Sequence, residues 1–179
     1  AFLATKITFI NEIANLCEKV DADVQDVARG IGLDNRIGSK FLHAGPGYGG
    51  SCFPKDTLAL LRTADDLGLP LEIVKATVAV NGQRKKDMAQ KVVDACGGSL
   101  QGKTVAVLGL TFKPNTDDMR DSPSLDIIPA LIAAGAKIRA YDPEGMDEAR
   151  AMLEGVEYCD DAYDTLPDAD ALTIITEWN

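Results

Sequence analysis

The sequence predicts a mixed fold in two parts, an all-α domain followed by a Rossmann-like α/β domain with a parallel sheet. In the first hundred residues, apolar positions recur at intervals of three and four, as on the buried face of a helix. From Lys103 onward, short β-branched runs alternate with helical stretches, which is typical of parallel strands joined by right-handed crossovers. Gly97 and Gly98 separate the two patterns. We therefore place the helical domain at residues 1–98 and the α/β domain at residues 99–179.

The first two helices of the helical domain are expected before residue 33. The first ends near Asp21, and its apolar stripe consists of Ile7, Ile10, Ile13, Ala14, Cys17 and Val20. Asp23 has the side chain of an N-cap and predicts a short second helix after it. Because glycine favours helix ends, Gly30 and Gly32 are expected to stop this helix.

Two more helices are expected after a glycine-rich segment. The apolar positions of the third are Leu58, Leu61, Ala64 and Leu67, and Gly68 closes it. The fourth is long and covers about residues 70–96, with Val74, Val78, Met88, Val92 and Ala95 at helical spacing. Gly97 ends it.

The α/β domain is expected to contain strands at residues 104–108, 137–141 and 171–175, with helices at 124–134 and 147–153. The turn after the first strand reads Gly-Leu-Thr-Phe-Lys from Gly109 and lacks two glycines of the dinucleotide-binding motif. A pyrophosphate could not be cradled there in the usual way. Because the chain stops soon after a strand, we expect this domain to be truncated.

Residues 45–56, GPGYGGSCFPKD, place a cysteine beside a run of glycines. Glycine permits positive φ and lets a ligand approach the backbone closely. Pro54 suits the first turn of a helix, where the negative charge of Asp56 is also favoured. Cys52 would then lie at a helix N-terminus, which stabilises a thiolate. The segment indicates a cysteine nucleophile; from the residues alone, a buried structural cysteine is the alternative.

Composition argues against several kinds of partner. The formal net charge of −10 disfavours nucleic acids and anionic membranes. No apolar stretch approaches the roughly 18 residues that a membrane span requires. Cys17, Cys52, Cys96 and Cys159 have no C-x-x-C pairing, so we expect thiols in a reducing cytoplasm rather than disulfides. With His43 as the only histidine, no metal site is expected.

Two long motifs resemble signatures of one enzyme family. Residues 45–56 resemble the active-site loop of the UDP-glucose 6-dehydrogenase family, which includes the GDP-mannose dehydrogenases, and residues 109–123, GLTFKPNTDDMRDSP, match its other signature. The resemblance covers essentially the whole chain, including residues 1–6 and 35–38. It implies that residues 1–98 are the central dimerisation domain and that residues 99–179 are part of a nucleotide-sugar-binding domain. NAD would be held mainly by a further domain preceding Ala1.

The resemblance implies an oxidoreductase that converts UDP-glucose to UDP-glucuronate in two hydride transfers to NAD. Cys52 would form a thiohemiacetal and then a thioester, and Asp56 matches an aspartate near the hydrolytic water. From the residues alone, Asp56 is equally a carboxylate of a first helical turn. The family's catalytic lysine and asparagine would precede Ala1, and Lys6 is not that lysine. The chain by itself is therefore expected to be inactive.

Ligand contacts are also implied by the resemblance. Those to the nucleotide sugar are Phe41, Leu42, His43, Ala44, Gly45, Gly49, Phe112 and Lys113, and those to NAD are Lys55 and Arg120. Arg36 matches an arginine that reaches the substrate in the neighbouring subunit. Without the resemblance, the charged residues of this set are ordinary solvated side chains. No metal is implied for the adjacent Asp117 and Asp118.

Other functions stay open at this point. Dehydrogenases of GDP-mannose or UDP-N-acetylhexosamines share both motifs. A hydrolase or acyltransferase using Cys52 and His43 would need an orienting acid and an oxyanion site. A non-catalytic dimerisation module, with residues 70–96 as its interface, is the third alternative. The resemblance itself implies a cytoplasmic, homodimeric enzyme of polysaccharide biosynthesis.

Overall fold

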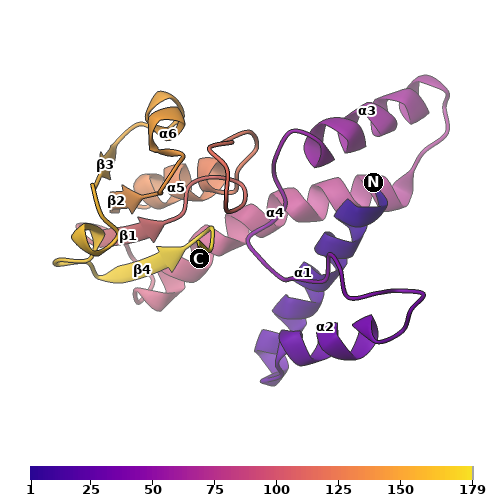
Figure 1. The fold of residues 1–179 in the computed structure, drawn as a ribbon, viewed down its shortest axis with the longest axis horizontal. Coiled ribbons are helices and arrows are strands. Elements are labelled where there is room, and N and C mark those ends of the chain that lie inside the picture. The colour runs from indigo at the N-terminus through magenta and orange to yellow at the C-terminus, as the bar shows by residue number, and fades with distance from the viewer. Residues whose placement is uncertain (179) are drawn as a thin grey trace. The chain divides into compact units, whose positions relative to one another are not determined.

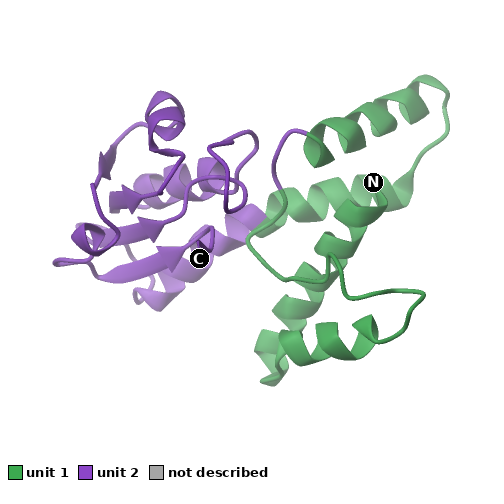
Figure 2. Ribbon diagram, in the orientation of Figure 1, with its two compact units in different colours: residues 1–48, 52–84 green, residues 49–51, 85–179 purple. Residues whose placement is uncertain are grey.

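The computed structural model describes residues 1–178, which divide into two compact units (Figures 1 and 2). Residues 1–48 and 52–84 form the first unit, and residues 49–51 join the second, which continues from Lys85. The division falls inside helix α4 (Glu72–Ala95), which contributes to both units. The domain boundary at residues 98/99 stays a prediction from the sequence pattern.

The first unit is helical, as predicted, and contains α1 (Phe2–Val20), α2 (Val24–Gly32), α3 (Phe53–Asp66) and the first part of α4. Helix α1 ends at Asp21, whose φ of 55° is left-handed. The side chain of Asp23 caps α2 by accepting a hydrogen bond of 2.7 Å from Gln25 N. The helix ends at Gly32, the second of the two glycines expected to stop it, and Gly30 lies inside the helix. One glycine costs a helix only about 1 kcal/mol, which the surrounding helix can offset.

Ile10, Ala28 and Leu42 form the buried cluster of this unit, with Ile13, Val24 and Ile31 packed around them. Helix α3 departs from its predicted stripe, because Leu58 and Leu67 are 54% and 69% exposed. Ala64, which belongs to the predicted stripe, is buried, and Thr57 is buried although it was not predicted. Helical spacing therefore identified the helix but only part of the face that it buries.

The second unit is built on a four-stranded parallel sheet in the order β3-β2-β1-β4 (Figure 1). The strands are β1 (Thr104–Leu108), β2 (Lys137–Tyr141), β3 (Val156–Tyr158) and β4 (Ala171–Ile174). Helices α5 (Ser124–Ala133) and α6 (Met146–Met152) connect β1 to β2 and β2 to β3, and a 3-10 turn lies at Tyr163–Thr165. Strand β3 and this turn were not predicted, because three-residue elements are too short to show a period.

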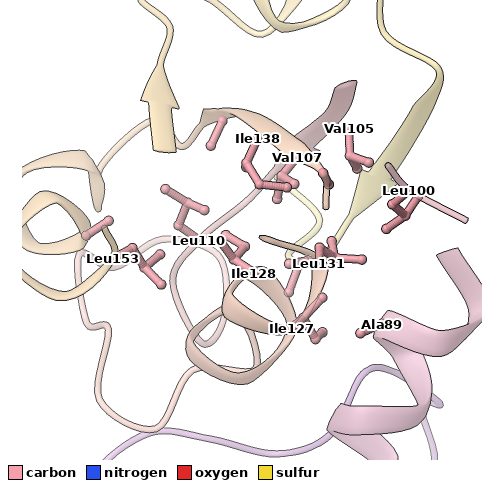
Figure 3. Close-up of a cluster of buried hydrophobic side chains, with 14 of the residues drawn as sticks. Ala89, Leu100, Val105, Val107, Leu110, Ile127, Ile128, Leu131, Ile138 and Leu153 are labelled. Atoms are coloured by element: carbon pink, nitrogen blue, oxygen red, sulfur yellow. The ribbon is translucent and has the colours of Figure 1, made fainter. Parts of the chain in front are cut away.

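The core of the second unit lies around β1 and α5 (Figure 3). Val105, Ala106 and Val107 are fully buried, as expected for the central strand of a parallel sheet. Helix α5 contributes Ile127, Ile128 and Leu131. Figure 3 places Ala89, on the second half of α4, beside Ile127, so this part of α4 packs into the same core.

The buried carboxylate of Asp142, just after β2, ties together the loops at the carboxyl ends of β1 and β2. One oxygen accepts hydrogen bonds from Leu110 N at 2.6 Å and Thr111 N at 3.2 Å, and the other accepts from Glu144 N and Gly145 N. The indole of Trp178 adds a donor at 3.2 Å. Burial raises the pKa of Asp142, but the backbone donors outweigh burial, so its pKa lies below the usual value.

Asp142→Asn is expected to lower the free energy of unfolding by about 2–3 kcal/mol, because an amide has one acceptor oxygen where the carboxylate has two. Since the folded-state pKa lies below that of the unfolded chain, the carboxylate's contribution is complete above about pH 4. It is lost as the pH falls through the folded-state pKa. Urea unfolding between pH 2 and pH 7 measures both effects. The exposed Asp160, changed to Asn, is the control; an equal loss there would contradict the assignment.

Candidate functional site

Cys52 is exposed at the N-terminal end of α3 and occupies the N-cap position. Its carbonyl accepts a hydrogen bond of 2.9 Å from Asp56 N, and Pro54 lies in the first turn, as the sequence predicts. The side chain of Asp56 is exposed one turn along from the thiol. The first N–H groups of a helix and its dipole favour an anion at this point. The Cys52 side chain therefore lies at a helix N-terminus where solvent reaches it.

An aromatic cluster fixes the residue that follows Cys52. The ring of Phe53 lies edge-on to Phe41 and to Tyr48, with centroid distances of 6.1 and 5.9 Å. Thr57 Oγ1 donates to Phe53 O at 2.7 Å, inside the first turn of α3. Burial raises the pKa of Tyr48, and its hydrogen bond with Thr57 partly opposes that shift. The start of α3 is therefore held by packing as well as by helix hydrogen bonds.

Polar side chains from α1 and α4 hold the first half of the glycine loop. Asn11 Oδ1 accepts from Gly45 N at 2.8 Å, while Arg84 Nε donates to Gly45 O at 2.9 Å. The Asn81 side chain pairs with both backbone groups of Tyr48. Its Oδ1 accepts from Tyr48 N at 2.8 Å, and its Nδ2 donates to Tyr48 O at 3.1 Å. Our sequence analysis missed these residues. The available signal was a polar side chain interrupting the apolar face of a helix.

Residues 41–45, the predicted sugar-nucleotide loop, have mixed environments. Phe41 is left-handed with a φ of 64°, and His43 is exposed. Leu42 lies in the buried cluster with Ile10 and Ala28, so a ligand could meet its backbone only. Ala44 and Gly45 are half-buried. Their roles as ligand contacts stay predictions.

Arg36 lies on the loop after α2 with its side chain 89% exposed. It forms a two-pronged ion pair with Asp34, and the guanidinium lowers the pKa of that carboxyl. Lys6 steadies the adjoining backbone by donating to the carbonyls of Ile37 and Lys40 at 2.9 and 2.6 Å. The guanidinium is thus presented to solvent on a braced loop. This is compatible with its predicted use across subunits.

The second motif follows β1 in the second unit, at the carboxyl edge of the parallel sheet. Strand β1 is flanked by β2 and β4, so this edge is a topological switch point, where doubly wound folds bind ligands. Lys113 Nζ lies 5.3 Å from the ring centre of Phe112. Arg120 donates to both carboxylate oxygens of Asp118 at 2.9 and 2.8 Å, which lowers the pKa of Asp118. The motif thus places Lys113 beside an aromatic ring and carries a second cation, Arg120, paired with Asp118.

Gly49 and Gly50, from the first motif, pack against the second. Gly50 N donates to Arg120 O at 2.8 Å. A Cβ added to Gly49 would lie 2.3 Å from Asp121 O, and one added to Gly50 would lie 2.8 Å from the Phe112 ring. Only glycine fits at these positions. Within the second unit, the structure therefore brings together four predicted site residues: Gly49, Phe112, Lys113 and Arg120.

Sequence comparison gives the same assignment for both halves of the chain. Residues 1–83 match the central domain of the UDP-glucose/GDP-mannose dehydrogenase family, and residues 106–179 match the UDP binding domain of that family. The chain belongs to the UDP-glucose/GDP-mannose dehydrogenase family. The resemblance inferred from the two motifs is confirmed.

Similar proteins from bacteria carry the name UDP-glucose 6-dehydrogenase. That of Rhizobium meliloti is 66% identical over all of this chain, which covers 41% of the relative. The Bacillus subtilis protein TuaD is 54% identical over 99% of this chain, which covers 39% of it. The chain thus spans about two fifths of the length of the relatives that it matches.

Solved structures agree with the mixed helical and α/β fold. A UDP-glucose dehydrogenase from Pyrobaculum islandicum matches with a TM-score of 0.95 and 42% identity, covering 99% of this chain and 41% of that one. An NDP-N-acetyl-D-galactosaminuronic acid dehydrogenase from Methanosarcina mazei matches with a TM-score of 0.84 and 27% identity, covering 99% and 39%. The predicted fold class is confirmed.

The α/β unit of this family member does not fit a dinucleotide in the usual manner. In the usual fold, an acid near the end of the second strand bonds a ribose hydroxyl. Here Asp142 has that place, but both its oxygens already accept backbone N–H groups. The backbone at Gly109 packs against Thr176, two residues after β4: a Cβ added to Gly109 would lie 2.2 Å from Thr176 O. The usual dinucleotide contacts are therefore not available in this unit, and the predicted NAD contacts stay those of Lys55 and Arg120.

Among residues 1–178, no three histidine, cysteine or acidic side chains are grouped so that they could hold a metal ion. No helix in the same range is long and apolar enough to cross a membrane.

We expect Cys52 to react with iodoacetamide near neutral pH at least about tenfold faster than the other cysteines, because it alone combines exposure with a helix N-terminus. Cys17 and Cys159 are buried, Cys96 is half-buried, and burial raises the pKa of the Cys159 thiol. Time-resolved peptide mapping by mass spectrometry measures all four rates. A Cys52→Ser variant should lose the fast phase. Alkylation of Cys96 first would refute the assignment.

Proposed function

We propose that this chain is part of an NAD-dependent UDP-glucose 6-dehydrogenase, which oxidises UDP-glucose to UDP-glucuronate. The observation that carries the proposal is Cys52, exposed at the N-terminal end of α3 within the family's active-site loop. A nucleophile at this position suits an oxidation that passes through a covalent intermediate. The resemblance implies that a catalytic lysine, a catalytic asparagine and the main NAD-binding domain precede Ala1. These parts would complete the site.

UDP-glucose is favoured as the substrate by the pattern of identities. Proteins named UDP-glucose 6-dehydrogenase are 66% and 54% identical to this chain. The Methanosarcina mazei enzyme, named for an N-acetylgalactosaminuronic acid, is 27% identical. Both share the fold, so the fold alone does not select the sugar.

In the proposed reaction, the C6 alcohol first loses a hydride and a proton and becomes an aldehyde. The Cys52 thiolate adds to that aldehyde and the oxygen takes up a proton, giving a thiohemiacetal. Loss of a second hydride from C6 and of the hydroxyl proton yields a thioester on Cys52. Water then attacks the carbonyl carbon, the C–S bond breaks, and the products are a carboxylate, the thiol and a proton. NAD, when bound, accepts one hydride in each oxidation.

The chain's own residues would act at defined points of this sequence. Cys52, at the N-terminal end of α3, would be both the attacking nucleophile and the leaving group. Asp56, exposed one turn along, would orient or deprotonate the hydrolytic water. Lys113 supplies positive charge to the nucleotide sugar's phosphates from the carboxyl edge of the sheet. Lys55, whose ammonium lies 3.4 Å from the Asp56 carboxylate, would contact NAD together with Arg120.

A cytoplasmic homodimer that pairs through the helical unit is part of the proposal. Large apolar side chains are exposed on this unit, among them Phe2, Leu16, Val20, Leu67 and Ile73. In the proposed dimer, a second copy of the chain would cover these side chains. Arg36 could then reach the partner's site, and the isolated chain would lack activity.

Cys52→Ser in the full-length protein should abolish sustained NADH production from UDP-glucose, because the hydroxyl cannot replace the thiolate as nucleophile and leaving group. Absorbance at the NADH band over many turnovers is the measurement. Cys96→Ser, the same change at a half-buried cysteine outside the site, should retain turnover. Normal turnover by the Cys52→Ser protein would refute the mechanism.

Lys113→Ala in the full-length protein should weaken UDP-glucose binding by about tenfold or more, since a charge-assisted contact contributes about 1.5–3 kcal/mol. Arg120→Ala should act mainly on NAD binding. Calorimetry with each ligand on both variants separates the two roles. Lys137→Ala, a change at an exposed lysine on the same sheet, should alter neither affinity. Unchanged UDP-glucose affinity after Lys113→Ala would remove the second motif from the substrate site.

A further inference from the structure

Lys85, on the part of α4 that belongs to the second unit, holds a buried ammonium group. Its side chain is 9% exposed, and Nζ lies 2.9 Å from Asp126 Oδ2 in the first turn of α5. Nζ also donates to the backbone carbonyl of Asp121 at 3.1 Å. A buried charge is tolerated only where it is paired and hydrogen-bonded, so these two contacts fix where the ammonium lies.

The carbonyl to which Lys85 donates is that of Asp121, in the turn at residues 119–122. The glycine segment Gly49–Ser51 packs against this turn. Asp121 is left-handed with a φ of 50°, which is uncommon for a residue other than glycine. Its carbonyl is the backbone group against which Gly49 packs. The preceding carbonyl, of Arg120, accepts the hydrogen bond of Gly50. Two successive carbonyls of this turn therefore define the position of Gly49 and Gly50.

We propose that Lys85 is a positioning residue for the segment Gly49–Ser51 and thereby for the backbone that leads into Cys52. It acts through Asp121: the ammonium fixes that carbonyl, the turn at residues 119–122 keeps its shape, and Gly50 keeps its hydrogen-bond partner. Asp126 aims the ammonium at this carbonyl. The catalytic part of this inference rests on the proposed function, because it assumes that Cys52 is the nucleophile.

Lys85→Met is the informative change, because methionine keeps the length of the side chain and removes the charge and the donors. Replacing a buried charge by an apolar group of similar volume is often neutral for stability. Asp126, which is half-exposed, would then be solvated. The carbonyl of Asp121 loses its donor, and the turn loosens. Lys85→Arg restores a cation, and Lys86→Met, at the exposed neighbouring lysine, is the matched control.

Hydrogen exchange of the 179-residue chain, followed by mass spectrometry, tests the positioning directly. In Lys85→Met, peptides covering residues 49–52 and 118–122 should exchange about tenfold faster than in the wild type. Peptides from β1 and α5 should not change. Lys85→Arg should lie within about threefold of the wild type, and Lys86→Met should match it. Asp126→Ala, which leaves Lys85 in place, should raise exchange in the same two segments by a smaller factor.

Kinetics of the full-length protein supply the second readout. Lys85→Met should lower kcat about tenfold, with KM for UDP-glucose within about threefold, because small misplacements of a reacting group are costly. Exchange that stays within twofold at residues 49–52, or that rises equally in every segment, would overturn the proposal. If the wild-type protein does not oxidise UDP-glucose, the proposed function fails, and the exchange experiment still decides the role of Lys85.

Discussion

The glycine-rich segment has no regular structure of its own, so its backbone groups must be paired by other parts of the chain. This requirement organises much of the surrounding structure, because an unpaired buried N–H or carbonyl is costly. Within the first unit, Asn11, Asn81 and Arg84 bond to Gly45 and Tyr48. Within the second, Arg120 O receives Gly50 N. Residues outside the loop thus order its backbone by hydrogen bonds. The close packing at Gly49 and Gly50 restricts the backbone further.

Local signals explain what the sequence alone could predict. Helical spacing located α1, α3 and α4, and β-branched runs located β1, β2 and β4, because these patterns arise within one element. Cys52 at the start of α3 was predictable for the same reason, since Pro54 marks a first helical turn two residues later.

Features that depend on distant pairing could not be predicted in this way. Asn81, Lys85 and Asp142 are polar residues whose partners lie roughly 30 residues or more away along the chain. The exposure of Leu58 has the same origin, because spacing alone does not say which side of a helix meets its neighbours. The roles of the predicted ligand contacts depend on ligands and on partner segments, and they stay predictions.

The hydrogen bond between Gly50 and Arg120 uses main-chain atoms at both ends, while the guanidinium of Arg120 is engaged with Asp118. The same holds for Asp121, which contributes its carbonyl and not its carboxylate to the contact with Gly49. A change of side chain at position 120 would therefore leave this main-chain contact with the nucleophile loop in place. Gly49 and Gly50 have no such freedom. Side chains on the turn are thus separable from its main-chain contact with the loop, whereas at Gly49 and Gly50 the contact itself excludes any side chain.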